Sequence, residues 1–104
     1  MFSSNSAPCA SPTSLILCEE RTALCGLLLC HRLYRHADGS LFMTVSYQGE
    51  RCAAALGNDF RAAVLFFFSV ADGLVTPCTF FEVLEDENMG FFQKISLQTL
   101  QNML

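Results

Sequence analysis

Basic residues are scarce in this chain of 104 residues, where six lysines and arginines stand against ten acids and leave a formal net charge of −4. Proteins that bind nucleic acid present basic surfaces to the phosphates, so we expect no nucleic-acid partner. Only 15% of the residues are charged and 52% are hydrophobic, a composition that excludes intrinsic disorder for most of the chain. The length is that of one domain with a single core.

The chain also lacks a long apolar run and a secretory signal. Its longest apolar stretch, residues 62–70, contains Ser69 and falls well short of the ~20 residues that a transmembrane helix needs. The first 12 residues carry neither the positive side chain nor the apolar run of a signal peptide. The six cysteines show no regular spacing of a disulfide framework. We therefore expect a cytoplasmic protein with reduced thiols and no membrane span.

Motifs of catalysis and nucleotide binding are absent as well. The sequence contains no phosphate-binding glycine loop, no GxGxxG fingerprint and no GxSxG nucleophile turn. We therefore expect neither enzymatic activity nor a bound cofactor.

Four segments between turn residues show the pattern of β-strands. The clearest is residues 41–47, where apolar and polar side chains alternate apart from Phe42, as in a strand with one buried face. Asp38-Gly39 just before it favours a tight hairpin. The four predicted strands are residues 15–21, 27–35, 41–47 and 51–56. The last contains three consecutive alanines and would also suit one turn of helix; we favour a strand, because another hairpin extends the sheet.

Helices are predicted in the second half of the chain. The first covers residues 59–72, with Asn58 as its N-cap and Gly73 as a left-handed C-cap. The second covers residues 77–86, where Thr76 caps and a proline stands at the first helical position.

These elements predict an α+β domain: an antiparallel meander of about four strands, followed by two helices packed on one face. Residues 1–12 are rich in Ser, Pro and Ala and predict a disordered tail, whereas residues 13–90 form the single domain. Residues 91–104 have leucines at roughly helical spacing and predict a C-terminal helix. The predicted core consists of Leu15, Leu17, Leu28, Leu41, Met43, Val45, Phe67 and Phe81.

Several short stretches resemble a known family. They are residues 19–22 (Glu-Glu-Arg-Thr), Asp59 at the helix start, and above all residues 72–77 (Asp-Gly-Leu-Val-Thr-Pro) leading into residues 81–86 (Phe-Glu-Val-Leu-Glu-Asp). Over about residues 15–87 the chain resembles a family of short proteins of clostridial Gram-positive bacteria, catalogued as a domain of unknown function. The resemblance implies a cytosolic bacterial α+β domain and supports a strand at residues 51–56. It brings no activity, cofactor or catalytic residue.

The first predicted helix is apolar nearly all round. Its expected core face comprises Phe60, Ala63, Val64, Phe67, Val70 and Ala71. Leu65, Phe66 and Phe68 lie outside that face. The resemblance implies charges on the outward side of this helix, whereas here that side includes Leu65 and Phe68. Either residues 91–104 or a second copy of the chain must cover them, whereas a membrane surface is disfavoured because the flanks are not basic. Our leading hypothesis is a non-catalytic protein-interaction module that forms a homo-oligomer, such as a dimer, or binds another protein.

An acidic face is predicted on the second helix. Glu82, Glu85 and Asp86 are spaced i, i+3, i+4 and share one side, which suits a cation or a basic partner. Acids at a helix C-terminus oppose the helix dipole, and no histidine completes a metal site there. We favour a solvated face.

Two alternative functions stay open. One is a thiol or metal site built from Cys30, His31, Cys52 and Cys78, although neighbours in a strand such as Cys30 and His31 point to opposite faces. Buried cysteines that pack in the core are the simpler interpretation. The other alternative is a small-molecule-binding domain or enzyme with a pocket between the sheet and the helices.

Overall fold

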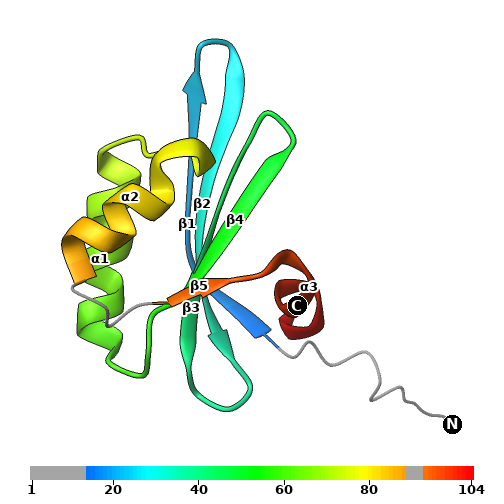
Figure 1. Ribbon diagram of the computed structural model, residues 1–104, viewed down its shortest axis with the longest axis vertical. Coiled ribbons are helices and arrows are strands. Elements are labelled where there is room, and N and C mark those ends of the chain that lie inside the picture. Colours follow the sequence, from blue (N-terminus) through cyan, green and yellow to red (C-terminus); the bar gives the residue numbers. More distant parts are fainter. Residues whose placement is uncertain (1–13, 89–92) are drawn as a thin grey trace, which may run out of the picture.

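The computed structural model describes residues 14–88 and 93–104, which form one five-stranded antiparallel sheet with helices on both faces (Figure 1). The strands lie in the order β1-β2-β3-β4-β5, so each pairs with the next along the chain. The elements are β1 Ser14–Leu24, β2 Leu27–His36, β3 Leu41–Tyr47, β4 Glu50–Ala55, α1 Phe60–Asp72, α2 Pro77–Asn88, β5 Gln93–Ile95 and α3 Leu97–Met103. The predicted α+β meander is confirmed, and so is the strand over residues 51–56.

Two of the hairpins use two-residue turns in which both residues have positive φ. These residues are Cys25 and Gly26 between β1 and β2, and Gln48 and Gly49 between β3 and β4. Turns of this kind twist in the same sense as the strands that they join, and they hold the long first hairpin in register.

The main core lies between the sheet and helices α1 and α2. Leu41, Met43, Val45 and Phe67 are buried as predicted, and Leu17 and Phe81 pack against this core while partly exposed. Leu15 and Leu28 were wrong core predictions, because they are 60% and 56% exposed. On β2 the helix-facing residues are Leu29, His31 and Leu33, and a shift of one residue along a strand reverses the face. In β1 a bulge between Ile16 and Cys18 shifts the register.

The ends of α1 differ in detail from the prediction. Asp59, not Asn58, caps the helix, because its Oδ1 accepts a hydrogen bond of 3.2 Å from the Ala62 N–H. Gly73 has φ −81° and the left-handed residue is Leu74. Glycine still fits position 73 because a Cβ there would lie 3.2 Å from the Ser69 carbonyl oxygen.

The buried face of α1 is rotated from the one predicted. It comprises Ala63, Phe66, Phe67, Val70 and Ala71, at spacing i, i+3, i+4, i+7, i+8. Phe60, expected in the core, is exposed at the first turn, whereas Phe66, expected outside it, is buried.

The C-terminal segment lies on the opposite face of the sheet from α1 (Figure 1). The predicted helix is confirmed for Leu97–Met103, but the sequence analysis missed β5, which pairs with β4. Leu100 and Ile95 join Tyr34, Phe42 and Ala53 in a second, smaller core. No helix within residues 14–88 or 93–104 is long and apolar enough to span a membrane. The predicted tail, residues 1–12, lies outside the described residues.

Candidate interaction surface and polar sheet face

The outward side of α1 carries an exposed stripe of four residues, Arg61, Leu65, Phe68 and Asp72, which we call the α1 stripe. Their spacing of four, three and four residues places all four on the side of the helix opposite the core. Leu65 is 66% exposed and Phe68 39% exposed. The ring of Phe68 meets the buried ring of Phe67 edge-on, with centroids 5.2 Å apart. The stripe is therefore an apolar centre between a cation and an anion.

Phe66 does not belong to this surface, which corrects its prediction as an interface residue. Its side chain is buried, and its ring lies 6.3 Å from that of Phe80 on α2. Of the three candidates outside the predicted core face, Leu65 and Phe68 remain available to a partner. The sequence does contain a signal that Phe66 is buried: it lies three residues after Ala63 and four before Val70, so the three share one face of the helix.

The predicted acidic face lies on α2. Glu82 and Glu85 are exposed, and the side chain of Asp86 lies outside the described residues. Neither glutamate forms an ion pair within the described parts of the chain. Both glutamates are thus open to solvent, and the solvated face favoured from the sequence stays a prediction.

The four predicted thiol and metal candidates do not form one site, although Cys78 lies close enough to Cys52 to contribute to raising the pKa of its thiol. Cys30 faces the side of the sheet away from α1 and α2, whereas His31 and Cys52 face those helices. Cys78 is exposed on α2, where its Sγ lies 4.0 Å from a carboxylate oxygen of Glu50. Burial raises the pKa of the Cys52 thiol to about 12, which keeps it protonated and unreactive at neutral pH. The side chains that the structure describes include no group of three from His, Cys, Asp or Glu that could hold a metal ion.

His31 is a buried polar residue beneath the α1–α2 connection. Its Nε2 lies 2.8 Å from the Val75 carbonyl oxygen, and a carbonyl can only accept, so Nε2 carries the proton and donates. The other ring nitrogen, Nδ1, has no hydrogen-bond partner among the described residues. Burial lowers the pKa of this histidine, although the hydrogen bond to Val75 and the charge of Glu20 oppose that shift.

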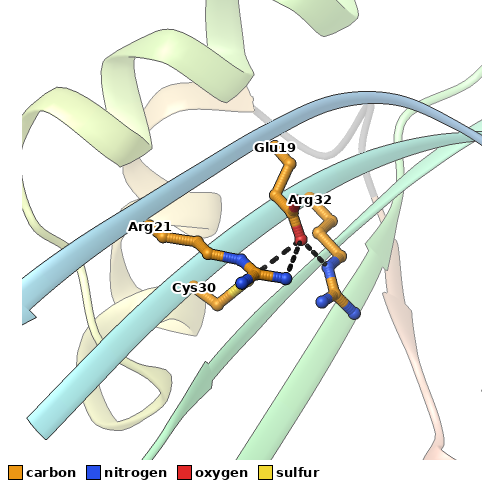
Figure 2. Close-up of polar contacts among 4 residues, drawn as sticks. All are labelled: Glu19, Arg21, Cys30 and Arg32. Carbon is orange, nitrogen blue, oxygen red and sulfur yellow. Dashed lines mark hydrogen bonds and ion pairs between the residues drawn. The ribbon is translucent and has the colours of Figure 1, made fainter.

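The face of the sheet away from α1 and α2 carries a polar cluster around one carboxylate (Figure 2). Glu19 Oε2 accepts from Arg32 Nε at 2.5 Å and from Arg21 Nη2 at 3.4 Å, and the Cys30 thiol lies 3.8 Å from the same oxygen. The hydrogen bond from Arg32 is the main reason that the pKa of Glu19 is lowered. The same bond, with one to Tyr34, raises the pKa of the Arg32 guanidinium. Sequence reasoning missed this cluster because its members meet only through the pairing of β1 with β2.

Beside this cluster the sheet surface forms an open hollow of about 380 Å³ over β2, β3 and β4. Its lining includes Cys30, Arg32, Thr44, Ser46 and Arg51. The helix α3 covers the neighbouring part of this face and leaves the hollow accessible.

Comparisons with protein-family models, with curated proteins and with solved structures found no match to this chain. The resemblance of residues 15–87 to short clostridial proteins therefore stays a prediction, and function has to be inferred from the geometry above.

Proposed function

We propose that this protein is a non-catalytic interaction module that forms a homodimer through the α1 stripe. The observation that supports the proposal is the stripe itself, in which two large apolar side chains, Leu65 and Phe68, are exposed side by side on a helix. Of the two candidates to cover them, the C-terminal segment packs against the opposite face of the sheet over residues 93–104. A second copy of the chain is the remaining candidate.

The charges at the two ends of the stripe fit a twofold dimer. Arg61 lies in the first turn of α1 and Asp72 at its last residue, and both are exposed. Two such helices packed antiparallel about a twofold axis place Arg61 of each copy opposite Asp72 of the other, and Leu65 opposite Phe68. The stripe is thus complementary to a second copy of itself, because apolar side chains meet apolar side chains and each cation meets an anion.

Arg61 and Asp72 also lie at the ends of α1 where the helix dipole makes their charges unfavourable in a single copy of the chain. A helix has a partial positive charge at its N-terminus and a negative one at its C-terminus, so a cation in the first turn and an anion in the last each cost about 0.3 to 1 kcal/mol. The N-cap carboxylate of Asp59 offsets part of the cost of Arg61, whereas no base in the last turn of the helix offsets Asp72. An antiparallel partner helix brings the opposite charge to each end and supplies the compensation.

The test compares the mass in solution of the wild-type protein with that of a variant substituted in the α1 stripe. Leu65→Lys places a charge at the centre of the proposed interface and should convert the dimer to a monomer at about 100 μM, a concentration well above a micromolar dissociation constant. Leu97→Lys is the matched control, because Leu97 is 55% exposed on α3 and lies away from α1. Sedimentation equilibrium measures both. A dimer that survives Leu65→Lys, or dissociates equally with Leu97→Lys, contradicts the proposal.

We further propose a cytoplasmic location and a bacterial origin, as the family resemblance implies. The free thiols support a reducing compartment, since Cys18, Cys25, Cys30, Cys52 and Cys78 are all unpaired in the described residues. The alternative thiol or metal function has less support, because Cys30 lies on the other face of the sheet from His31, Cys52 and Cys78.

A further inference from the structure

The hollow on the open sheet face has a size and a lining that suit a small ligand. Its volume of about 380 Å³ lies in the ~300 to 1,000 Å³ range of small-molecule sites. Thr44 and Cys30 are buried and form its floor, while Ser46 and Arg32 are half-buried and Arg51 is exposed at its side. Gln48 and Gly49 of the β3–β4 turn close one end.

The register of the sheet brings these polar groups together. Ser46 on β3 is paired with Cys30 on β2 and with Arg51 on β4, so the three form one cross-strand row. Thr44 is paired with Arg32 in the next row on the same face. Two guanidinium groups from different strands therefore flank two hydroxyl groups, and all four lie on one side of the sheet.

This face is positive although the chain as a whole is acidic. Among the described side chains it carries Arg21, Arg32 and Arg51 against the one carboxylate of Glu19, whereas the net charge of the chain is −4. Glu50 also borders the hollow, and one of its carboxylate oxygens lies 4.0 Å from the Cys78 thiol on α2. Arg51 forms no ion pair with any side chain that the structure describes.

Arg32 is held in place by Glu19 and keeps N–H donors for a further hydrogen-bond partner. Its Nε is bound to Glu19 and a further hydrogen bond joins it to Tyr34, while Figure 2 shows its two terminal nitrogens pointing away from the Glu19 carboxylate. A guanidinium has five N–H donors in a fixed fork that matches the oxygens of a carboxylate or a phosphate. Glu19 thus positions Arg32 as a fixed donor, while Arg51 contributes a charge that no described acid neutralises.

We propose that this hollow binds a small organic anion through a carboxylate or phosphate group. Arg51 and Arg32 donate charge-assisted hydrogen bonds to the anion, and the Ser46 and Thr44 hydroxyls donate from the floor. The exposed side chain of Leu28 at the rim contacts the apolar part of the ligand. This inference is independent of the proposed dimer, because α1 packs on the other face of the sheet.

The test is a titration of the isotope-labelled protein with three probes at constant ionic strength: inorganic phosphate, phenyl phosphate and benzoate. Amide signals of Ser46, Gly49 and Arg51 are followed by two-dimensional NMR. We expect saturable shifts confined to the hollow, with dissociation constants of about a millimolar or below for the better organic probe. Phenyl phosphate and benzoate distinguish a phosphate from a carboxylate ligand, and inorganic phosphate reports how much the anion contributes alone.

Two variants and a control locate the binding. Arg51→Gln removes an exposed charge and should weaken binding about tenfold, the effect of losing one hydrogen bond to a charged group. Ser46→Ala should weaken it several-fold while leaving the charge unchanged, and it serves also if Arg51→Gln fails to fold. Arg35→Gln is the matched control, because Arg35 lies exposed on β2 but on the other face.

Three results would overturn the inference. The first is the absence of saturable shifts with all three probes at about 10 mM, which is tenfold above a millimolar dissociation constant. The second is an equal loss of affinity with Arg35→Gln and Arg51→Gln, which indicates general charge attraction. The third is binding of an acidic peptide that depends on Arg51 when none of the small anions binds, which assigns the face to a protein partner.

Discussion

His31 shows at the scale of one residue how burial and hydrogen bonding set a charge state. The ring is fully buried in the core, and its one hydrogen bond joins β2 to the connection between α1 and α2. Protonation would place a charge in an apolar surrounding with no partner at Nδ1, which explains the lowered pKa.

The consequence is a loss of stability in mild acid. Above pH 6.5 the histidine is neutral in both the folded and the unfolded chain, so it adds no pH dependence. Below pH 6.5 the unfolded chain takes up a proton that the folded protein still refuses, so the free energy of unfolding falls as the pH falls toward the folded-state pKa. Urea unfolding at pH 7.5, 6.5 and 5.5 measures this, with a limiting slope of about 1.4 kcal/mol per pH unit for one proton.

A variant isolates the contribution of His31. His31→Gln removes the titrating group and should flatten the pH dependence in this window, at a cost in stability at all pH values. His36→Gln is the control, because His36 is only half-buried and lies near Asp38 at the β2–β3 turn. The interpretation fails if the pH dependence disappears with His36→Gln and persists with His31→Gln.

At the scale of an element, Phe66 and Phe68 of α1 differ in burial and should therefore differ in their effect on stability. Phe66→Ala removes a buried ring and should lower the free energy of unfolding by about 3 to 5 kcal/mol. Phe68→Ala removes an exposed ring and should cost the monomer less than about 1 kcal/mol while weakening the dimer. Denaturant unfolding at low protein concentration gives the monomer stabilities. Equal losses for the two variants would contradict the orientation of α1 described above.

Helix α3 is a second element whose role can be tested. Leu100 is buried against Tyr34 and Phe42, so Leu100→Ala should lower the free energy of unfolding by about 2 to 5 kcal/mol. Leu97→Ala, three residues away and exposed, should change it by less than about 0.5 kcal/mol. Thermal unfolding of both variants would show whether the C-terminal helix belongs to the cooperative unit. A small effect of Leu100→Ala would mean that it does not.

The sequence predicts elements well where the local signal is unbroken. The strand Leu41–Tyr47 is predicted with its observed bounds because its alternation continues through the segment, and Thr76-Pro77 places the start of α2 within one residue. β5 is missed because three residues carry no measurable period. Leu28 is misplaced because residues 27–29 are all leucine, and a run without alternation does not reveal which face is buried.

At the scale of the whole molecule, the two faces of the sheet carry different features. Helices α1 and α2 cover one face and α3 lies on the other (Figure 1). The proposed dimer surface is on α1, whereas the arginine-lined hollow is on the face that carries α3. The exposed stripe could be predicted in part, since Leu65 and Phe68 already stand outside the core face in the sequence. The hollow could not, because Arg32, Ser46 and Arg51 come together only through the register of three strands.

The most direct test of the proposed dimer exchanges the charges of the α1 stripe. Arg61→Glu places an acid opposite Asp72 of the second copy and should give a monomer, although an acid in the first turn favours the helix itself. Adding Asp72→Arg to that variant restores opposite charges across the twofold axis and should restore the dimer. Native mass spectrometry of the three proteins gives the subunit number directly. We predict dimer, monomer and dimer in that order; a monomeric wild-type protein, or a double variant that stays monomeric, would contradict the proposal.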